Sequence, residues 1–280
     1  MQDSKIFDRD LLRKRRNKIA SNWHNYNFIK LEAAERLADC IIDIAREFHL
    51  VLDIGCHKKE LANIIVKKSK IISCDFAENM QPDIVCDEEL LPFADNSFDL
   101  VTSVLSLHHV NDLVGTLIQI KNILKPDAPF IGIIYGVNTL IELRNSFLGV
   151  SSEFNFPLSP RISSMAEIRD AGALLQRAGF ALPVINTETI TVNYDNLFKL
   201  MADLRGQGES NIMTSRSRNF TTRSYFEKVA EYYQANYGNQ DGTIRATFEL
   251  ITVTGWKPHE SQQKSAKRGS GKINLNQLFD

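Results

Sequence analysis

Short apolar runs, several of them ending in glycine or aspartate, recur through the first half of the chain and restrict its fold more than any other feature. Stretches with helical spacing of apolar residues stand before or between them, as at 28–48 and 112–124. Short buried strands that alternate with helices indicate βαβ units and a parallel sheet. This part of the chain is therefore predicted to form an open α/β sheet. The runs lie at residues 50–54, 71–75, 84–86, 98–105 and 129–135.

Charge and apolar length exclude several classes of protein. The 280 residues hold 33 Lys+Arg against 34 Asp+Glu, a net charge of -1, whereas a nucleic-acid-binding domain is normally basic. No apolar run approaches the roughly 20 residues that cross a bilayer. We expect no signal peptide, because the start of the chain is charged throughout. The four cysteines form no C-x-x-C pair and are expected to be reduced and structural.

Three residues able to bind a ligand follow successive predicted strands. Gly55 ends the first run, and a glycine turn before a helix lets backbone amides approach a ligand closely. Asp75 ends the second run, 22 residues after Asp53, where a carboxylate can accept hydrogen bonds from ribose hydroxyls. Asp87 ends the third run and could accept from a base amine, although both aspartates could instead cap helices. Because ligands bind beyond the carboxyl ends of such strands, the set favours a nucleoside pocket.

These residues, with segments 92–101 (PFADNSFDLV) and 124–127 (LKPD), resemble the motifs of class I S-adenosylmethionine-dependent methyltransferases. The resemblance implies an α/β, Rossmann-like sheet of seven strands, mainly parallel, with the last strand antiparallel. It also implies a methyltransferase-like enzyme with S-adenosylmethionine as cofactor. The cofactor-binding residues that it implies are Asp53, Gly55, Asp75, Asp87, Ser103 and Leu105.

A narrower resemblance runs nearly from end to end. In several segments the chain is similar to the methyltransferase-like family of assembly factor 5 of complex I (NADH:ubiquinone oxidoreductase). That family implies a protein partner, an iron–sulfur subunit of complex I, and hydroxylation of an arginine on it near the quinone site. The alternative is a small-molecule or malonyl-acyl-carrier-protein O-methyltransferase of the same fold. The segments are 6–9 (IFDR), 87–93 (DEELLPF), 106–112 (SLHHVND), 139–144 (TLIELR), 203–211 (DLRGQGESN) and 255–259 (GWKPH).

The turn after the first strand departs from the family pattern. His57 and Lys59 stand where glycine is usual, which costs backbone freedom if φ is positive there. Two consequences are open. Either Lys58 or Lys59 pairs with the cofactor carboxylate and binding is retained, or the pocket is closed and the chain is an inactive assembly scaffold.

Outside the cofactor motifs, four residues are candidates for substrate chemistry. His108 follows the fourth strand and is predicted to be a general base or a substrate contact. Arg144, Glu209 and Asn211 lie in the family-like segments and are predicted to contact the substrate. No metal site is expected, because His108, His109 and Asp112 lack iron-ligand spacing and no distant third ligand is evident.

The domain organisation follows from these patterns. We expect a helical cap over 1–47, a methyltransferase-like domain over 48–259 with insertions at about 137–164 and 195–244, and a flexible tail over 260–280. The basic run 13–18 is predicted to be a solvated helix face, with a peripheral contact to an anionic membrane or partner as the alternative. Early aspartates are unlike a transit peptide and favour a bacterial cytoplasmic protein; a processed mitochondrial chain would lie at the matrix face of the inner membrane.

Overall fold

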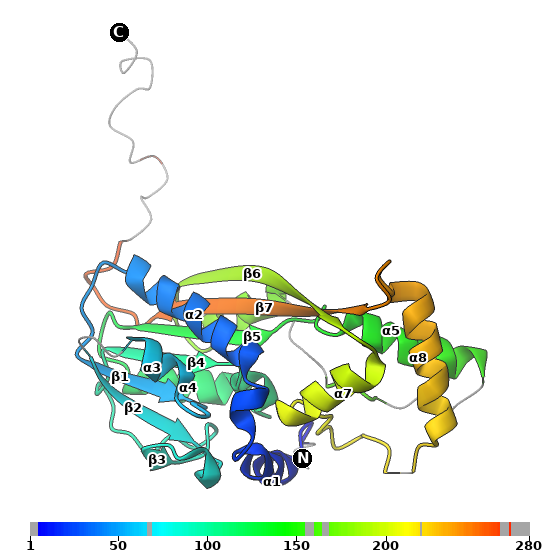
Figure 1. Cartoon of the computed structure of the whole chain (residues 1–280). Helices are drawn as coiled ribbons and strands as arrows, with labels where there is room; N and C mark the ends of the chain where they lie inside the picture. Colours follow the sequence, from blue (N-terminus) through cyan, green and yellow to red (C-terminus); the bar gives the residue numbers. More distant parts are fainter. Residues whose placement is uncertain are drawn as a thin grey trace.

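A single seven-stranded sheet organises the chain, in the order β3-β2-β1-β4-β5-β7-β6 (Figure 1). The computed structural model describes residues 5–65, 69–154, 160–163, 168–218, 220–263 and 269. β1 to β5 are parallel to one another, whereas β7 is antiparallel to both β5 and β6. The predicted seven-stranded, mainly parallel sheet is confirmed. The strands are β1 (Leu50–Ile54), β2 (Lys70–Asp75), β3 (Ile84–Val85), β4 (Leu100–Val104), β5 (Pro129–Tyr135), β6 (Ala181–Tyr194) and β7 (Ile244–Trp256).

Two apolar layers bury the sheet, one on each face. α2 (Phe28–Asp43) and α3 (Glu60–Ile65) pack on one face, and α4 (Leu113–Ile123) and α6 (Ile168–Arg177) pack on the other. In β5 alternate side chains serve the two layers, because successive side chains of a strand point to opposite faces. A strand covered on both faces must be apolar throughout, which is why the buried runs are so clear in the sequence.

The helix boundaries follow local signals in the sequence. α4 begins after Asp112, whose Oδ1 accepts a hydrogen bond from the Gly115 amide at 2.8 Å, close to the predicted range 112–124. α3 ends at Ile65, and residues 66–68 lie outside the described residues. The predicted tail, 260–280, is described only to residue 263 and at 269.

The two predicted insertions supply three further helices beyond one end of the central strands. They are α5 (Ile141–Glu153), α7 (Leu197–Gly206) and α8 (Arg223–Tyr237). α5 packs on α8, with the Phe147 and Tyr225 rings stacked at 6.3 Å. The long strands β6 and β7 reach from the sheet to these helices (Figure 1).

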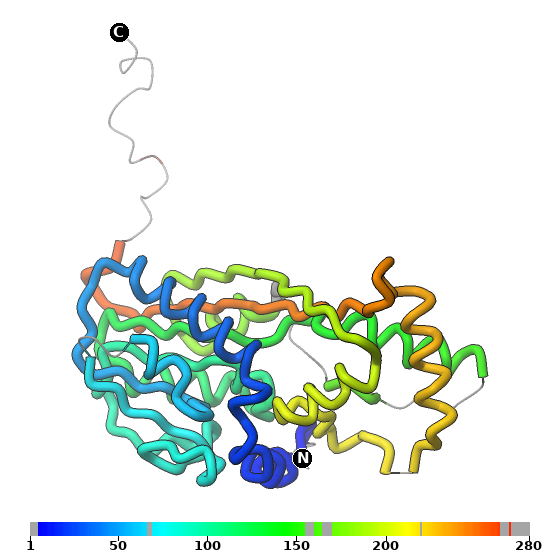
Figure 2. Tube along the Cα trace, in the orientation of Figure 1, coloured from blue at the N-terminus to red at the C-terminus, as the bar shows by residue number. Residues whose placement is uncertain are grey.

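The N-terminal segment lies beside the carboxyl ends of the first strands (Figure 2). α1 (Arg9–Ile19) begins after Asp8, which accepts from the Leu11 amide, and the short helix η1 (Trp23–Asn25) leads into α2. α1 contacts the short helix η2 (Glu78–Met80), which follows β2. This position brings the basic run of α1 against the predicted cofactor residues.

The described part of the chain has neither a membrane-spanning helix nor a disulfide. None of its helices combines the length and apolar character needed to span a bilayer. All four cysteines lie within it, and each is free rather than in a disulfide, as predicted.

Candidate functional site

The turn after β1 has the backbone strain that its sequence predicts. Gly55, His57 and Lys59 all have positive φ, at 65°, 48° and 67°. A Cβ on Gly55 would lie 2.1 Å from the Ser106 Oγ, so glycine is required there for space as well as for conformation. The two non-glycine residues adopt the left-handed region that costs about 1–2 kcal/mol for a side chain.

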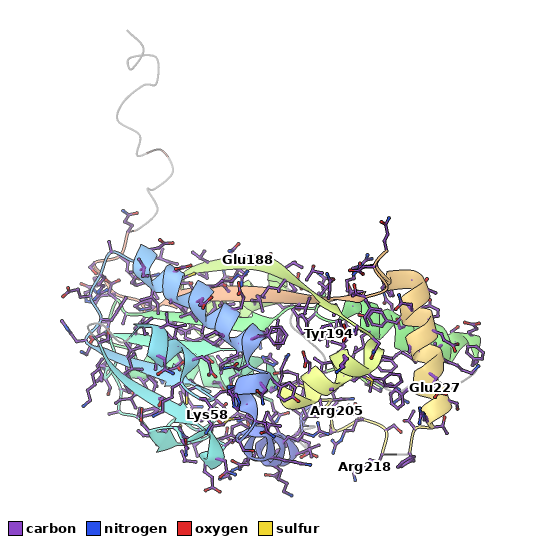
Figure 3. All side chains as sticks on the ribbon, in the orientation of Figure 1. Lys58, Glu188, Tyr194, Arg205, Arg218 and Glu227 are labelled. Carbon is purple, nitrogen blue, oxygen red and sulfur yellow. The ribbon has the colours of Figure 1, made fainter. Side chains whose placement is uncertain are left out.

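Each side chain of this turn has partners within the protein. Lys58 donates to the Asn79 carbonyl at 2.8 Å and Lys59 to Asp83 at 2.5 Å, both on the exposed side (Lys58 is labelled in Figure 3). Both lysines are thus paired with groups of the protein on the exposed side of the turn. His57 instead turns inward and stacks on Trp23, with ring centroids 4.7 Å apart.

A buried lysine of α2, Lys30, contacts this turn from the protein interior. The Lys30 Nζ donates to the Gly55 carbonyl at 2.8 Å and to the Val104 carbonyl, and lies 2.9 Å from the His57 Nδ1. Burial lowers the pKa of Lys30, and Glu60 partly offsets this. Burial also holds the pKa of His57 well below its usual range. The cation nearest to Gly55 is thus Lys30, which the sequence patterns did not single out.

Asp53, the first acidic residue of the motif, is buried under this turn. Its Oδ1 accepts a hydrogen bond from the Thr102 Oγ1 at 3.2 Å. Burial raises the pKa of Asp53 to about 7, although the Lys30 charge opposes the rise. Asp53 therefore lies beneath the turn and links β1 to β4 through Thr102.

Two arginines of α1 occupy the carboxylates at the ends of β2 and β3. Arg9 pairs with Asp87 at 2.5 Å and with Glu88, while Arg16 lies 3.4 Å from both Asp75 and Glu88. Arg16 is only 2% exposed, so the predicted solvated face of the basic run is wrong at this residue. We call Arg9, Arg16, Asp75, Asp87 and Glu88 the arginine–carboxylate cluster.

Within this cluster Asp75, the residue predicted to bind the ribose, already accepts three hydrogen bonds. Asp75 accepts from the amides of His57 at 3.1 Å and Ala77 at 2.9 Å as well as from Arg16. Burial raises the pKa of Asp75, and Arg16 opposes this. Both guanidinium groups also lie over the Phe76 ring, at 4.7 and 4.9 Å from its centroid.

The structure places the other two predicted cofactor residues on the neighbouring strand end. Ser103 donates its hydroxyl to the Ile54 carbonyl at 2.9 Å, which ties β4 to β1. Leu105 follows β4 with φ of 45°, and its amide donates to the Ile133 carbonyl at 2.8 Å. All six predicted cofactor residues thus lie at or next to the carboxyl ends of β1 to β4.

A second polar cluster lies just beyond β4, where two histidines meet a glutamate from the segment after α7. His108 and His109 belong to the short helix η3 (Leu107–His109), and their rings are 4.1 Å apart. The Glu209 Oε2 is 3.4 Å from the His108 Nε2 and 3.5 Å from the His109 Nε2. Burial holds the pKa of His109 well below its usual range. We call these three residues the histidine–glutamate cluster.

Glu209 also lines a cavity of about 200 Å³ between α5 and α7. Asn211 and Arg205 line it too, with Arg205 labelled at the end of α7 in Figure 3. Arg144 does not; it donates to the carbonyls of Val137 at 2.7 Å and Thr139 at 3.4 Å. The structure therefore brings together three of the four predicted substrate residues and separates Arg144 from them.

Comparisons with known proteins decide the family. A model described as a methyltransferase domain matches residues 52–132. The proteins named "Arginine-hydroxylase NDUFAF5, mitochondrial" from Mus musculus and Homo sapiens are each 42% identical over 287 residues, covering 98% of this chain and 83% of the relative. The chain belongs to the NDUFAF5 arginine-hydroxylase family. It is an enzyme of the methyltransferase-like class, as its sequence motifs predict.

Other matches place this NDUFAF5-family chain among wider relatives. A malonyl-(acyl-carrier protein) O-methyltransferase from Methylovorus sp. is 28% identical over 91% of both chains, which makes that alternative the more distant one. A solved putative methyltransferase from Bacillus halodurans superposes with a TM-score of 0.56 at 17% identity, covering 80% of this chain and 99% of that chain. At that identity the structure confirms the Rossmann-like fold alone.

The chemistry of the strand ends fits the cofactor of this fold, with one condition. Asp75 and Asp87 offer carboxylate oxygens for hydroxyl and amine donors, and the glycine turn allows backbone approach. Arg16, however, already bonds Asp75 and lies over Phe76. In this NDUFAF5-family site S-adenosylmethionine would have to share Asp75 with Arg16 or displace it.

Proposed function

We propose that the chain hydroxylates an arginine on an iron–sulfur subunit of complex I, near the quinone site, during assembly of that complex. The identity to the arginine-hydroxylases extends over 98% of the chain. It thus includes the N-terminal segment and both insertions, which lie outside the methyltransferase match at 52–132. Those parts hold α1 and Glu209, so the likeness covers both polar clusters rather than the sheet alone.

S-adenosylmethionine is proposed as the cofactor of the strand-end site. Asp75 would accept from the ribose hydroxyls, Asp87 from the base amine, and Gly55 would admit the cofactor to the backbone. Asp53 would support the turn from below, and Ser103 and Leu105 would line the pocket with backbone atoms. When bound, the cofactor supplies an electrophilic methyl group on a positively charged sulfur.

The cavity at Glu209 is proposed to receive the substrate arginine. Its apolar walls, from α5 and α7, suit the aliphatic part of an arginine side chain, and Glu209 offers a carboxylate to the guanidinium. Asn211 lines the same cavity, although its amide already bonds the Pro160 carbonyl at 2.7 Å. His108 would act beside Glu209 as a base or a substrate contact.

The domain plan and the location are part of this proposal. Residues 48–259 would form the catalytic unit, 1–47 its cap and 260–280 a tail. The curated relatives are named mitochondrial, which supports the matrix face of the inner membrane for a processed chain; a bacterial cytoplasm is the alternative. Arg13, Lys14 and Lys18 are exposed on α1 and would supply a contact with an anionic partner or membrane surface.

The test is the mass of the arginine peptide in cells that lack this chain. Re-expressed wild-type chain is expected to restore a peptide heavier by one oxygen atom, whereas a variant with Glu209→Gln restores less. Asp241→Asn, a fully exposed substitution, serves as control. Restored complex I with an unmodified arginine would show that the chain is an assembly scaffold. Methyl transfer to malonyl-acyl-carrier protein would show that it is the alternative enzyme. Either result overturns the proposal.

A further inference from the structure

The histidine–glutamate cluster has the donor set of a metal site. The ligand atoms of His108, His109 and Glu209 all lie within 4.8 Å of one another. In the described part of the chain, this is the one set of three such groups close enough to hold an ion. The argument against a metal, that no distant third ligand exists, fails because folding brings Glu209 to the histidines.

The spacing of these atoms suits a bound divalent ion. Two ligand atoms, each about 2.1 Å from a metal, lie about 3.0–3.4 Å apart at octahedral to tetrahedral angles. The two Nε2–Oε2 distances are 3.4 and 3.5 Å, so only small movements are needed to admit the ion. Two imidazoles and one carboxylate that leave positions open are the ligands of non-haem iron(II) oxygenases.

One nitrogen of each imidazole has no partner among the described residues, whereas the other faces the Glu209 carboxylate. Both Nδ1 atoms are buried and have no hydrogen-bond partner in the described part of the chain. With the proton on Nδ1, each Nε2 would present its lone pair to an ion bound beside the Glu209 Oε2.

Both arms of the cluster are held in place by α1. Arg9 donates to the His109 carbonyl at 3.3 Å, and Arg15 donates to the carbonyls of Ser210 and Asn211, each at 2.9 Å. These contacts hold the backbone at His109 and just after Glu209. Preorganised ligands bind a metal with little loss of conformational entropy.

We propose that His108, His109 and Glu209 bind one iron(II) ion, which activates dioxygen next to the substrate cavity. This assignment rests on the proposed arginine hydroxylation, and it gives His108 the role of a metal ligand in place of a base or substrate contact. A substrate C–H bond is broken and a C–O bond to one oxygen atom is formed, while the other oxygen atom leaves as water. The C–H bond supplies two electrons, and an external two-electron reductant with two protons supplies the rest; ascorbate is the probe for that reductant.

Metal binding is tested with the full chain under anaerobic conditions. Iron(II) is titrated calorimetrically, and cobalt(II) is added separately so that its visible absorption reports nitrogen and oxygen ligation. We expect one ion per chain, and a loss of affinity of at least about a hundred-fold in Glu209→Gln and in His109→Asn. The control is His24→Asn, which removes an exposed histidine far from the cluster in sequence.

Each outcome decides between the site and the function. Unchanged iron binding in Glu209→Gln with intact thermal unfolding, or stronger selection of zinc with no iron bound, overturns the iron site. Iron bound through these residues without arginine hydroxylation, even with ascorbate and dioxygen, upholds the site and overturns the proposed function. Full hydroxylation by the metal-depleted chain upholds the function and overturns the site.

Discussion

The two polar clusters beside α1 differ in how completely their charges are matched. In the arginine–carboxylate cluster, two guanidinium groups face three carboxylates, and Ser106 adds a hydroxyl donated to Glu88 at 2.8 Å. In the histidine–glutamate cluster, one carboxylate oxygen faces two imidazoles whose other nitrogens lack partners. In the described part of the chain the first arrangement leaves one side-chain atom without a partner, the Arg9 Nε, whereas the second leaves a ring nitrogen of each histidine without one.

Replacing Arg16 is expected to have the largest effect, and it tests the arginine–carboxylate cluster. Arg16→Met leaves Asp75 and Glu88 buried beside an apolar side chain, so we expect a loss of about 3–5 kcal/mol in the free energy of unfolding. Urea denaturation measures the loss. Arg13→Met, on the exposed face of the same helix, should change it by less than about 0.5 kcal/mol. Equal losses from the two substitutions would contradict the stabilising role of Arg16 in the arginine–carboxylate cluster.

The pH dependence of the free energy of unfolding tests Asp53, the buried acid under the turn after β1. Asp53 has its pKa raised from an ordinary 3.8 to about 7, so the folded chain keeps a proton that the unfolded chain releases. The free energy of unfolding should therefore fall as pH rises from about 4 to 7, by at most about 4 kcal/mol from this group. Asp53→Asn should remove that part of the slope in denaturation curves taken across the window. An unchanged slope would show that Asp53 is ionised throughout.

The histidine–glutamate cluster should contribute little to the stability of the metal-free chain. Glu209→Gln retains an oxygen that accepts one of the two histidine bonds, and we expect a loss of less than about 1 kcal/mol. The same urea measurement shows the contrast with Arg16→Met. A loss as large as that of Arg16→Met would mean that Glu209 is structural and would remove the contrast between the clusters.

The smallest expected effect concerns the strained turn after β1, which borders the arginine–carboxylate cluster. Lys59→Gly relieves a φ of 67° and gives up a half-exposed pair with Asp83, so stability should rise by less than about 1 kcal/mol. Lys58 does not have positive φ, so Lys58→Gly should lower stability instead. Changes of the same sign in both variants, measured by thermal unfolding, would refute strain as the cause.

Local signals determined most of what could be predicted. The runs of β1 and β5 are apolar on both faces because helices cover both, and Gly55 stands where a side chain would collide with Ser106. Arg16 was misjudged because a basic run is ordinarily solvated, and only the tertiary fold supplies the carboxylates that bury it. The pairing of His108 with Glu209 spans 101 residues, and no periodicity of either segment encodes it.

One helix, α1, touches both clusters, through Arg16 on one side and Arg15 on the other. A ligand that drew Arg16 from Asp75 would act on the same helix whose Arg15 bonds the backbone just after Glu209. By thermodynamic linkage, whatever free energy the strand-end ligand transmits to that segment, an ion there returns in equal amount. α1 is thus a support shared by the two clusters, and a shift of it on binding at one cluster would be passed to the other.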